Sequence, residues 1–380
     1  MTGAGNALAV VVAGGGTGGH LYPGIAVARE IQRQRPGTVV TFAGTARGIE
    51  ARVVPREGFE LDVIRSGGLK GKSIAVRLKG VALLPLSAVD AWRLLSKRRP
   101  RLVVGVGGFS SGPVVALAAL RGIPTLLLEQ NAVPGLTNRL LARFVRAAAV
   151  NFEAALSYFP RTGFVAGNPV RPEFFPAQNE EANDRSNRPR DAARVLIFGG
   201  SQGAHAINVA MVEAATRLAA SGIRLAITHQ TGERDLDLVR AAYERAGLAA
   251  RVEAFIFQID GEMKAADVVI CRAGATTLAE LAASRTPAIL VPLPTATDDH
   301  QRKNAEALSS AGAAELLEQR ELTGATLASR ILALLDDEPR RAQLAAAVKR
   351  FARPDAARAI VDRVLDIAKQ PSAKGVPAGA

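Results

Sequence analysis

The feature that most constrains the fold is a run of glycines directly after an apolar, β-branched stretch. Residues 8–24 read LAVVVAGGGTGGHLYPG, with five glycines between Gly14 and Gly19. The stretch before them predicts a buried strand, and the residues that follow predict a helix. Glycines allow positive φ angles and a close approach of backbone amides to a ligand, and a helix N-terminus favours negative charge. The pattern predicts a strand, a tight loop and a helix start; the loop is either an anion site or a turn without a ligand.

Strand-like runs and helical patterns alternate along the rest of the chain, which predicts parallel sheets covered on both faces. The expected strands are 39–42, 102–106, 125–128 and 147–150 in the first half, and 195–198, 225–228, 252–255, 268–271 and 288–291 in the second. Between the halves, the charged segment 178–191 has no apolar periodicity and predicts a linker or loop. We predict an α/β chain of two doubly wound, Rossmann-like domains that face a cleft.

Composition limits the partners and the class of protein. With 48% hydrophobic and 22% charged residues the chain is typical of globular proteins, and its single cysteine excludes an intramolecular disulfide. No stretch approaches the roughly 20 apolar residues of a membrane span, so we expect a cytosolic protein. The net charge of +13 predicts an anionic partner: a nucleotide, a nucleic acid or an acidic membrane surface. Nucleic acid is disfavoured because aromatics are only 4% and no nucleic-acid-binding signature is present.

The glycine loops narrow the choice of ligand. Residues 14–19 satisfy G-x-G-x-x-G, but a dinucleotide site also expects an acid at the end of the second strand, where the chain reads Phe42-Ala43-Gly44-Thr45. This argues against a redox dinucleotide. Two further glycine loops follow strands at 105–113 and 199–204, and none ends in the Gly-Lys-Ser/Thr of a P-loop. Three such loops would line both walls of the predicted cleft.

Several motifs together carry a family resemblance. In chain order they are GGGTGGHLYPG (14–24), GVGGFSSGP (105–113), LLEQNAVPGLTNR (127–139), GNPVR (167–171), GGSQGAHAIN (199–208), CRAGATTLAEL (271–281) and DDHQRKNA (298–305). They resemble the MurG family, the lipid-linked N-acetylglucosaminyltransferases of peptidoglycan synthesis, from about residue 8 to 350. The resemblance implies a GT-B glycosyltransferase fold. It also implies inverting transfer of GlcNAc from UDP-GlcNAc to the C4 hydroxyl of MurNAc in lipid I, forming lipid II.

The resemblance further implies a division of labour between the halves. Residues 1–170 would bind the acceptor and associate with the membrane, with an amphipathic helix at 354–369 packing back on them. Residues 171–353, including the polar linker 176–193, would bind UDP-GlcNAc, and the tail 370–380 would be disordered. We expect a peripheral protein at the cytoplasmic face of the inner membrane, with partners among cell-wall synthesis and division proteins. The alternatives are a GT-B transferase with another acceptor and an enzyme like UDP-GlcNAc 2-epimerase.

Two residues compete as general base. His20, near the first loop, is by spacing alone a loop histidine bonded to backbone, whereas the resemblance makes it the group that deprotonates the acceptor. Glu129 is the rival base, and it could instead be structural or orient Asn131. Phe109 stands where relatives can carry tyrosine, which removes a hydroxyl. The residues expected at the acceptor and its pyrophosphate are Gly15, Gly16, Gly107, Gly108 and Phe109.

Glu280 is the most informative of the predicted donor residues. The sequence Thr277-Leu278-Ala279-Glu280 is typical of a capping box, whereas the resemblance assigns Glu280 to the two ribose hydroxyls. Arg171 is either a solvated linker residue or a phosphate ligand. By resemblance, the donor set is Thr17, Gly18, Gly19, Asn131, Arg171, Ser201, Ile256, Ala275, Thr276, Thr277, Glu280 and Gln301.

A metal and a membrane surface are the remaining possibilities. Asp235-Leu-Asp237 matches the Asp-x-Asp of metal-dependent transferases, but its helical context predicts a solvated face, and we expect neither a metal nor another cofactor. The segment 69–101 mixes apolar and basic residues, which is either an ordinary amphipathic helix or a surface for anionic lipid. The residues predicted to meet the membrane are Ile74, Leu78, Lys72, Arg77 and Lys79.

Overall fold

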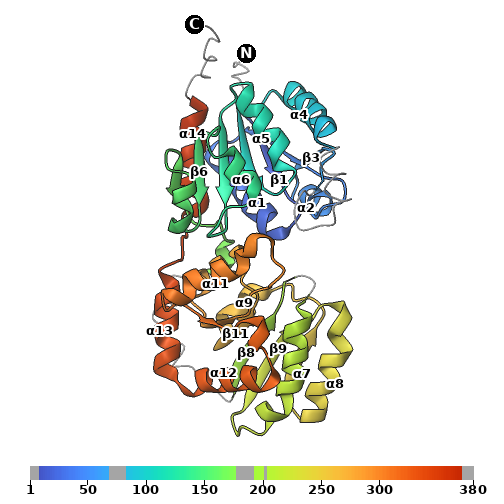
Figure 1. Ribbon diagram of the computed structural model, residues 1–380, viewed down its shortest axis with the longest axis vertical. Helices are drawn as coiled ribbons and strands as arrows, with labels where there is room; N and C mark the ends of the chain where they lie inside the picture. Colours follow the sequence, from blue (N-terminus) through green and yellow to red (C-terminus); the bar gives the residue numbers. More distant parts are fainter. Residues whose placement is uncertain (1–7, 68–82, 177–191, 201–202, 370–380) are drawn as a thin grey trace. The chain divides into compact units, whose positions relative to one another are not determined.

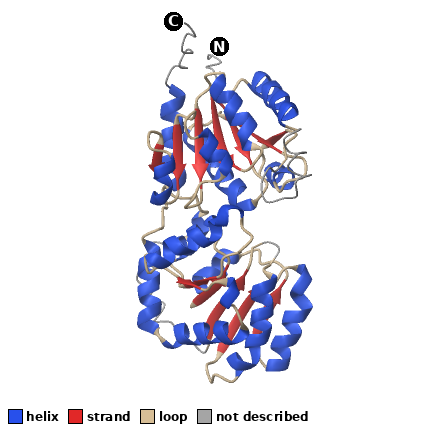
Figure 2. Ribbon diagram, viewed as in Figure 1, coloured by secondary structure: helices blue, strands red, loops and turns tan. Residues whose placement is uncertain are grey.

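The computed structural model describes residues 8–67, 83–176, 192–200 and 203–369 (Figure 1). The chain divides into two compact units. The first unit holds the described residues up to Pro169 together with those from Asp355 onward, and the second is Val170–Pro354. Each unit is a parallel sheet with helices packed around it (Figure 2). The predicted linker 178–191 and tail 370–380 lie outside the described residues.

The first sheet is parallel throughout and places the first two glycine loops side by side. Its order is β3 (Glu60–Val63), β2 (Val39–Gly44), β1 (Ala9–Gly14), β4 (Leu102–Gly107), β5 (Thr125–Glu129), β6 (Ala147–Val150) and β7 (Gly163–Val165). The strand order reverses between β1 and β4, and such a switch point is where doubly wound sheets bind ligands. The loops after β1 and β4 both begin there.

Alternate side chains of this sheet enter two different cores. Val10 and Val12 pack with α1 (Gly18–Gln34) and α14 (Ala356–Lys369), whereas Val11 and Ala13 pack with α4 (Leu84–Arg98) and α5 (Ser111–Leu120). The shorter helices are α2 (Glu50–Arg56), α6 (Leu136–Leu141) and η1 (Glu153–Tyr158). Burial on both faces explains why the strands read as continuous apolar runs. The helix expected at 354–369 is α14, and it contributes Ile360 and Val364 to the core of the first unit.

The second sheet repeats this architecture. Its order is β10 (Ala250–Glu253), β9 (Leu225–Gln230), β8 (Ala193–Phe198), β11 (Val268–Cys271), β12 (Ala288–Leu290) and β13 (Glu315–Leu316). The helices are α7 (His205–Ala219), α8 (Leu236–Ala246), α9 (Ile259–Ala265), α10 (Ala275–Ser284), α11 (His300–Ser310), α12 (Gly324–Asp336) and α13 (Glu338–Lys349). The 3-10 turns are η2 (Pro172–Phe174), η5 (Glu233–Asp235), η6 (Thr297–Asp299) and η7 (Gln319–Glu321). The switch point falls between β8 and β11, where the third glycine loop and α10 begin.

The ten predicted strands are confirmed, with shifted ends. The largest shift is in β10, which ends at Glu253, so Phe255 lies beyond the strand and not in it. The sequence does not predict β3, β7 and β13, which are short and only partly buried. Such strands lack the apolar run on which the prediction depends.

Candidate active site

The first glycine loop crosses closely over the end of β4. Gly14, Gly15 and Gly16 have φ angles of 139°, 146° and 85°, and a Cβ at Gly14 would lie 2.4 Å from the Gly107 oxygen. Helix α1 begins at Gly18, with Thr17 as its N-cap. Gly18 and Gly19 therefore lie in the first turn of α1, where backbone amides point out of the helix. The predicted strand, loop and helix start are confirmed.

His20 also lies in this first turn and is half-buried. Its Nδ1 is 2.9 Å from the Thr17 Oγ1, and its ring lies against Gly107, where a Cβ would be 2.7 Å from the His20 Cδ2. When Nδ1 carries the proton and donates it to Thr17, the Nε2 lone pair is the one that can accept a proton. In that tautomer His20 can act as a general base; because the Thr17 hydroxyl can either accept from or donate to Nδ1, the contact is compatible with both neutral tautomers.

The second loop meets the first. Gly107 and Gly108 both have positive φ, and a Cβ at Gly108 would lie 2.6 Å from the Gly15 oxygen. Phe109 follows them and is 40% exposed, with its carbonyl accepting a hydrogen bond from Ser66 Oγ at 3.1 Å. The structure therefore brings together all the residues predicted at the acceptor, and it places His20 beside them.

Glu129, the rival base, is the last residue of β5 and is 3% exposed. Its Oε1 accepts from the backbone and side-chain amides of Asn131 at 2.9 and 3.2 Å. Its Oε2 accepts from Gly135 N at 3.2 Å and from Asn138 Nδ2 at 2.9 Å. Burial raises the pKa of Glu129, and these hydrogen bonds oppose the rise. Of the alternatives for Glu129, the structure shows the one in which it orients Asn131. Asn138, a second partner of this carboxylate, was not predicted.

In the second unit, Gln230 ties the third glycine loop to the predicted uracil residue. Its Nε2 donates to the Gly200 carbonyl at 2.7 Å, and its Oε1 accepts from the Ile256 amide at 2.9 Å. Ile256 is 4% exposed and is flanked by the exposed rings of Phe255 and Phe257. Because the Ile256 amide is engaged, its carbonyl is the backbone group predicted to contact the uracil base. Ser201, predicted in this loop, lies outside the described residues.

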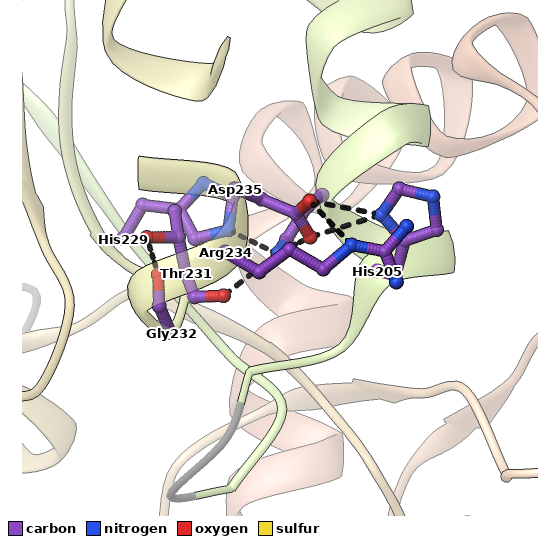
Figure 3. Close-up of polar contacts among 7 residues, drawn as sticks. His205, His229, Thr231, Gly232, Arg234 and Asp235 are labelled. Atoms are coloured by element: carbon purple, nitrogen blue, oxygen red, sulfur yellow. Dashed lines mark hydrogen bonds and ion pairs between the residues drawn. The ribbon is translucent and has the colours of Figure 1, made fainter. Parts of the chain in front are cut away.

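A buried polar network supports the same loop (Figure 3). Asn208 Nδ2 donates to the Thr231 carbonyl at 2.9 Å and to Asp235 Oδ2 at 2.8 Å, and its Oδ1 lies 3.1 Å from His229 Nε2. Burial lowers the pKa of His229 to about 3, so the ring is neutral. Because Asn208 Oδ1 can only accept, His229 Nε2 carries the proton, and Nδ1 accepts from the Tyr243 hydroxyl at 2.8 Å.

This network corrects the interpretation of Asp235-Leu-Asp237. Asp237 has a 95% exposed side chain, as a solvated face requires, but Asp235 is 5% exposed. The Asp235 carboxylate accepts from Asn208 and contacts His205 Nδ1 at 3.0 Å (Figure 3). The prediction is wrong for Asp235 because a turn, η5, precedes α8 and directs this side chain inward. Among the described residues, no cluster of three or more His, Cys, Asp or Glu could hold a metal ion.

Helix α10 carries the central donor prediction. It begins at Ala275, with Gly274 as N-cap, so Ala275, Thr276 and Thr277 form its first turn. The capping-box alternative for Glu280 is wrong: α10 starts at Ala275, with three residues between it and the end of β11, so Thr277 is already its third residue. Burial raises the pKa of Glu280 to about 7, the charge of Arg171 opposes the rise, and Asp260 adds to it. Arg171 and Glu280, predicted for different parts of UDP, therefore interact electrostatically within the second unit.

Gln301 lies at the start of α11, half-buried, and its Oε1 accepts from the Leu293 amide at 3.0 Å. Just before α11, Asp298 and Asp299 have φ angles of 57° and 56°. Residues other than glycine rarely adopt these left-handed backbone angles, and such backbone strain concentrates at functional sites. Asn304, which the sequence analysis missed, is fully buried and donates to the Ala273 carbonyl at 3.3 Å, which joins α11 to the loop before α10.

The predicted membrane residues Ile74, Leu78, Lys72, Arg77 and Lys79 lie outside the described residues. The part of their segment that is described, α4, presents Leu86, Val89 and Trp92 with 41%, 44% and 54% exposure. Arg121 lies 4.7 Å above the Trp92 ring. None of the helices in the described ranges is long and apolar enough to cross a membrane.

Comparison with known proteins decides the family. Residues 10–150 match the glycosyltransferase family 28 N-terminal domain, and residues 194–360 match the family 28 C-terminal domain. The chain belongs to glycosyltransferase family 28. Within this family it is 47% identical over 362 residues to a protein of Anaeromyxobacter dehalogenans (strain 2CP-C), covering 95% of this chain and 93% of the relative. That relative is named UDP-N-acetylglucosamine--N-acetylmuramyl-(pentapeptide) pyrophosphoryl-undecaprenol N-acetylglucosamine transferase.

A Myxococcus xanthus (strain DK1622) protein of the same name is 44% identical over 362 residues, which is 95% of this chain and 93% of that protein. Among solved structures, Acinetobacter baumannii MurG is similar with a TM-score of 0.78 and 30% identity, covering 94% of this chain and 99% of that one. The predicted GT-B fold of two Rossmann-like domains is confirmed for this family 28 chain.

Proposed function

We propose that this chain transfers GlcNAc from UDP-GlcNAc to the C4 hydroxyl of MurNAc in lipid I, with inversion, to form lipid II. The observation that carries the proposal is the 47% identity, over 95% of the chain, to a relative whose name states this donor and this acceptor. The alternatives are a transferase with another acceptor and an epimerase, and the experiment below separates them.

The donor binds to the second unit in this proposal. The amides in the first turn of α10 hold the diphosphate together with Arg171, since helix N-termini and guanidinium groups suit phosphate oxygens. Glu280 accepts hydrogen bonds from the ribose hydroxyls, Gln301 contacts the GlcNAc hydroxyls, and the Ile256 carbonyl contacts uracil. Arg171 and Glu280 interact electrostatically, so these two predicted donor residues belong to one region of the second unit.

The chemistry takes place at His20. Its Nε2 accepts the proton of the C4 hydroxyl while the oxygen attacks C1 of GlcNAc, and the bond from C1 to the UDP oxygen breaks. UDP leaves with the electron pair on the face opposite the attacking oxygen, and this single displacement inverts the anomeric centre. The amides of α10 and Arg171 stabilise the charge that develops on UDP, so the reaction needs no metal. Nε2 is the accepting nitrogen in the tautomer in which His20 Nδ1 donates to Thr17 Oγ1.

The acceptor's lipid requires access to a bilayer, and α4 supplies a suitable surface. Leu86, Val89 and Trp92 are exposed at three-residue spacing on one face of the helix, with Arg93 exposed beside them. Such a face binds the interface of an anionic membrane without spanning it. We infer peripheral attachment at the cytoplasmic face of the inner membrane, where cell-wall synthesis and division proteins are the expected partners.

Incubation of the purified protein with UDP-GlcNAc and a lipid I analogue tests the function. UDP release that depends on the analogue, together with formation of a β-linked disaccharide, is expected. UDP release without an acceptor, UDP-ManNAc as the product, or equal transfer to an unrelated acceptor would contradict the proposal.

A further inference from the structure

Glu50 is a buried carboxylate that the sequence analysis did not single out. It is the first residue of α2 and is 1% exposed. Its Oε2 accepts from the Gly16 amide at 2.8 Å, and its Oε1 accepts from the amide and the hydroxyl of Thr45 at 2.9 and 2.8 Å. Burial raises the pKa of Glu50, but the hydrogen bonds outweigh burial and hold it below its usual value. The carboxylate is therefore ionised and bonded to the first glycine loop.

Three glycines make room for this side chain. A Cβ at Gly44 would lie 2.6 Å from the Glu50 Cγ, one at Gly15 would lie 2.7 Å from its Cδ, and one at Gly48 would lie 2.1 Å from its Oε2. No real Cβ makes contacts so short. Part of the glycine pattern therefore accommodates the Glu50 carboxylate. The Gly16 amide donates to this carboxylate and is not available to a phosphate.

A series of backbone contacts between glycines connects Glu50 with His20. Gly15 lies between the Glu50 carboxyl group and Gly108, whose Cβ would be 2.6 Å from the Gly15 oxygen. The neighbouring Gly107 forms the surface on which the His20 ring lies. Because these are backbone contacts without side chains to adjust, a displacement of Gly15 moves the Gly107–Gly108 turn with it.

We propose that Glu50 is a positioning residue for His20, because it fixes the Gly15–Gly16 backbone against the Gly107–Gly108 turn. The inference rests on the proposed role of His20 as general base. A glutamine at position 50 would keep the size, but its NH2 group would face either the Gly16 amide or the Thr45 amide, and two donors cannot pair. One backbone amide would lose its acceptor in either orientation.

Glu50→Gln tests the inference, with Glu213→Gln as matched control. Glu213 Oε2 likewise accepts a glycine amide at a helix start, that of Gly324 at 2.9 Å, in the second unit. Two quantities are measured: turnover at saturating substrates, and the rate at which diethyl pyrocarbonate modifies His20, followed by peptide mass spectrometry with His205 as internal reference. UDP-GlcNAc affinity is measured by calorimetry, because the proposed contacts with the diphosphate, ribose and uracil all lie in the second unit.

For Glu50→Gln we expect turnover to fall at least tenfold and the His20 modification rate to change at least threefold, with UDP-GlcNAc affinity within twofold of wild type. Unchanged His20 reactivity and turnover would overturn the inference, and so would an equal change in Glu213→Gln. If Glu50→Gln does not fold, Thr45→Val, which removes one of the three hydrogen bonds, takes its place with a smaller effect expected. If the wild type forms no disaccharide, the proposed function fails, while His20 reactivity still reports on the contact with Glu50.

Discussion

Replacing Glu280 with glutamine should weaken donor binding and stabilise the fold at the same time. A glutamine keeps the size of the side chain but replaces one acceptor oxygen with an NH2 group and removes the charge. One charge-assisted hydrogen bond is worth roughly 1.5–3 kcal/mol, so the Kd for UDP-GlcNAc should rise about 10- to 150-fold. The diphosphate of UDP-GlcNAc does not titrate near neutral pH, which makes it a better probe than UDP.

The pH dependence follows from the raised pKa. Burial, opposed by Arg171, places the pKa of Glu280 at about 7. In the proposed role, only the ionised form accepts from both ribose hydroxyls. At pH 6 about one-tenth of the carboxyl is ionised, so the wild-type Kd should rise about tenfold between pH 8 and pH 6. The glutamine variant should show no such dependence.

The effect on stability has the opposite sign. The pKa of Glu280 is about 7 in the folded chain against an ordinary value of 4.5, so the folded state holds the proton more tightly. Above pH 7 both states are ionised and the folded state carries the full cost, up to about 3 kcal/mol; the cost fades as the pH falls and is absent below 4.5. Glu280→Gln should therefore raise the free energy of unfolding at pH 8 and leave it unchanged at pH 4.

Calorimetry at pH 6, 7 and 8 and urea unfolding at pH 4 and 8 measure both effects. Glu213→Gln, a carboxylate of the same unit with a different partner, serves as the control. Donor affinity in Glu280→Gln equal to wild type at pH 8, or wild-type affinity independent of pH, would refute the reasoning.

Three further variants test the first unit. Gly107→Ala places a Cβ 2.7 Å from the His20 Cδ2 at a φ of 94°, so turnover should fall at least tenfold while the UDP-GlcNAc Kd in calorimetry stays within twofold; wild-type turnover would disprove the contact. Thr17→Val should lower turnover about tenfold in the steady state because His20 Nδ1 loses its partner, whereas Thr17→Ser should not; equal losses would contradict the tautomer argument. Trp92→Ala should lower retention on anionic vesicles at low salt severalfold in a sedimentation assay, and Trp92→Phe should retain binding; no loss in Trp92→Ala would exclude α4 from the membrane surface.

The parts of the site that could be predicted from the sequence are those coded locally. Glycines after a β-branched run mark where a strand ends and a loop begins, so the positions of Gly14–Gly16 and Gly107–Gly108 are predicted correctly. A local motif can also mislead: Thr277 and Glu280 have capping-box spacing, but α10 begins at Ala275, two residues before Thr277, so Thr277 is not its N-cap.

Contacts between residues that are far apart in the sequence cannot be predicted from local patterns. Glu50 meets Gly16 across 34 positions, and nothing in the sequence near α2 indicates that its first carboxylate points at a loop. The same holds for Asn208 of α7, which contacts His229 of β9 and Asp235 of η5.

The return of α14 to the first unit has a consequence for synthesis. Ile360, Val361, Val364 and Ile367 complete the core that α1 begins, yet they follow Pro169 by about 190 residues. At roughly 5–20 residues per second, a ribosome makes them about 10 to 40 seconds after the rest of the first unit. During that interval the part of α1 that α14 covers stays exposed, whereas the second unit can close its own core before α14 is made.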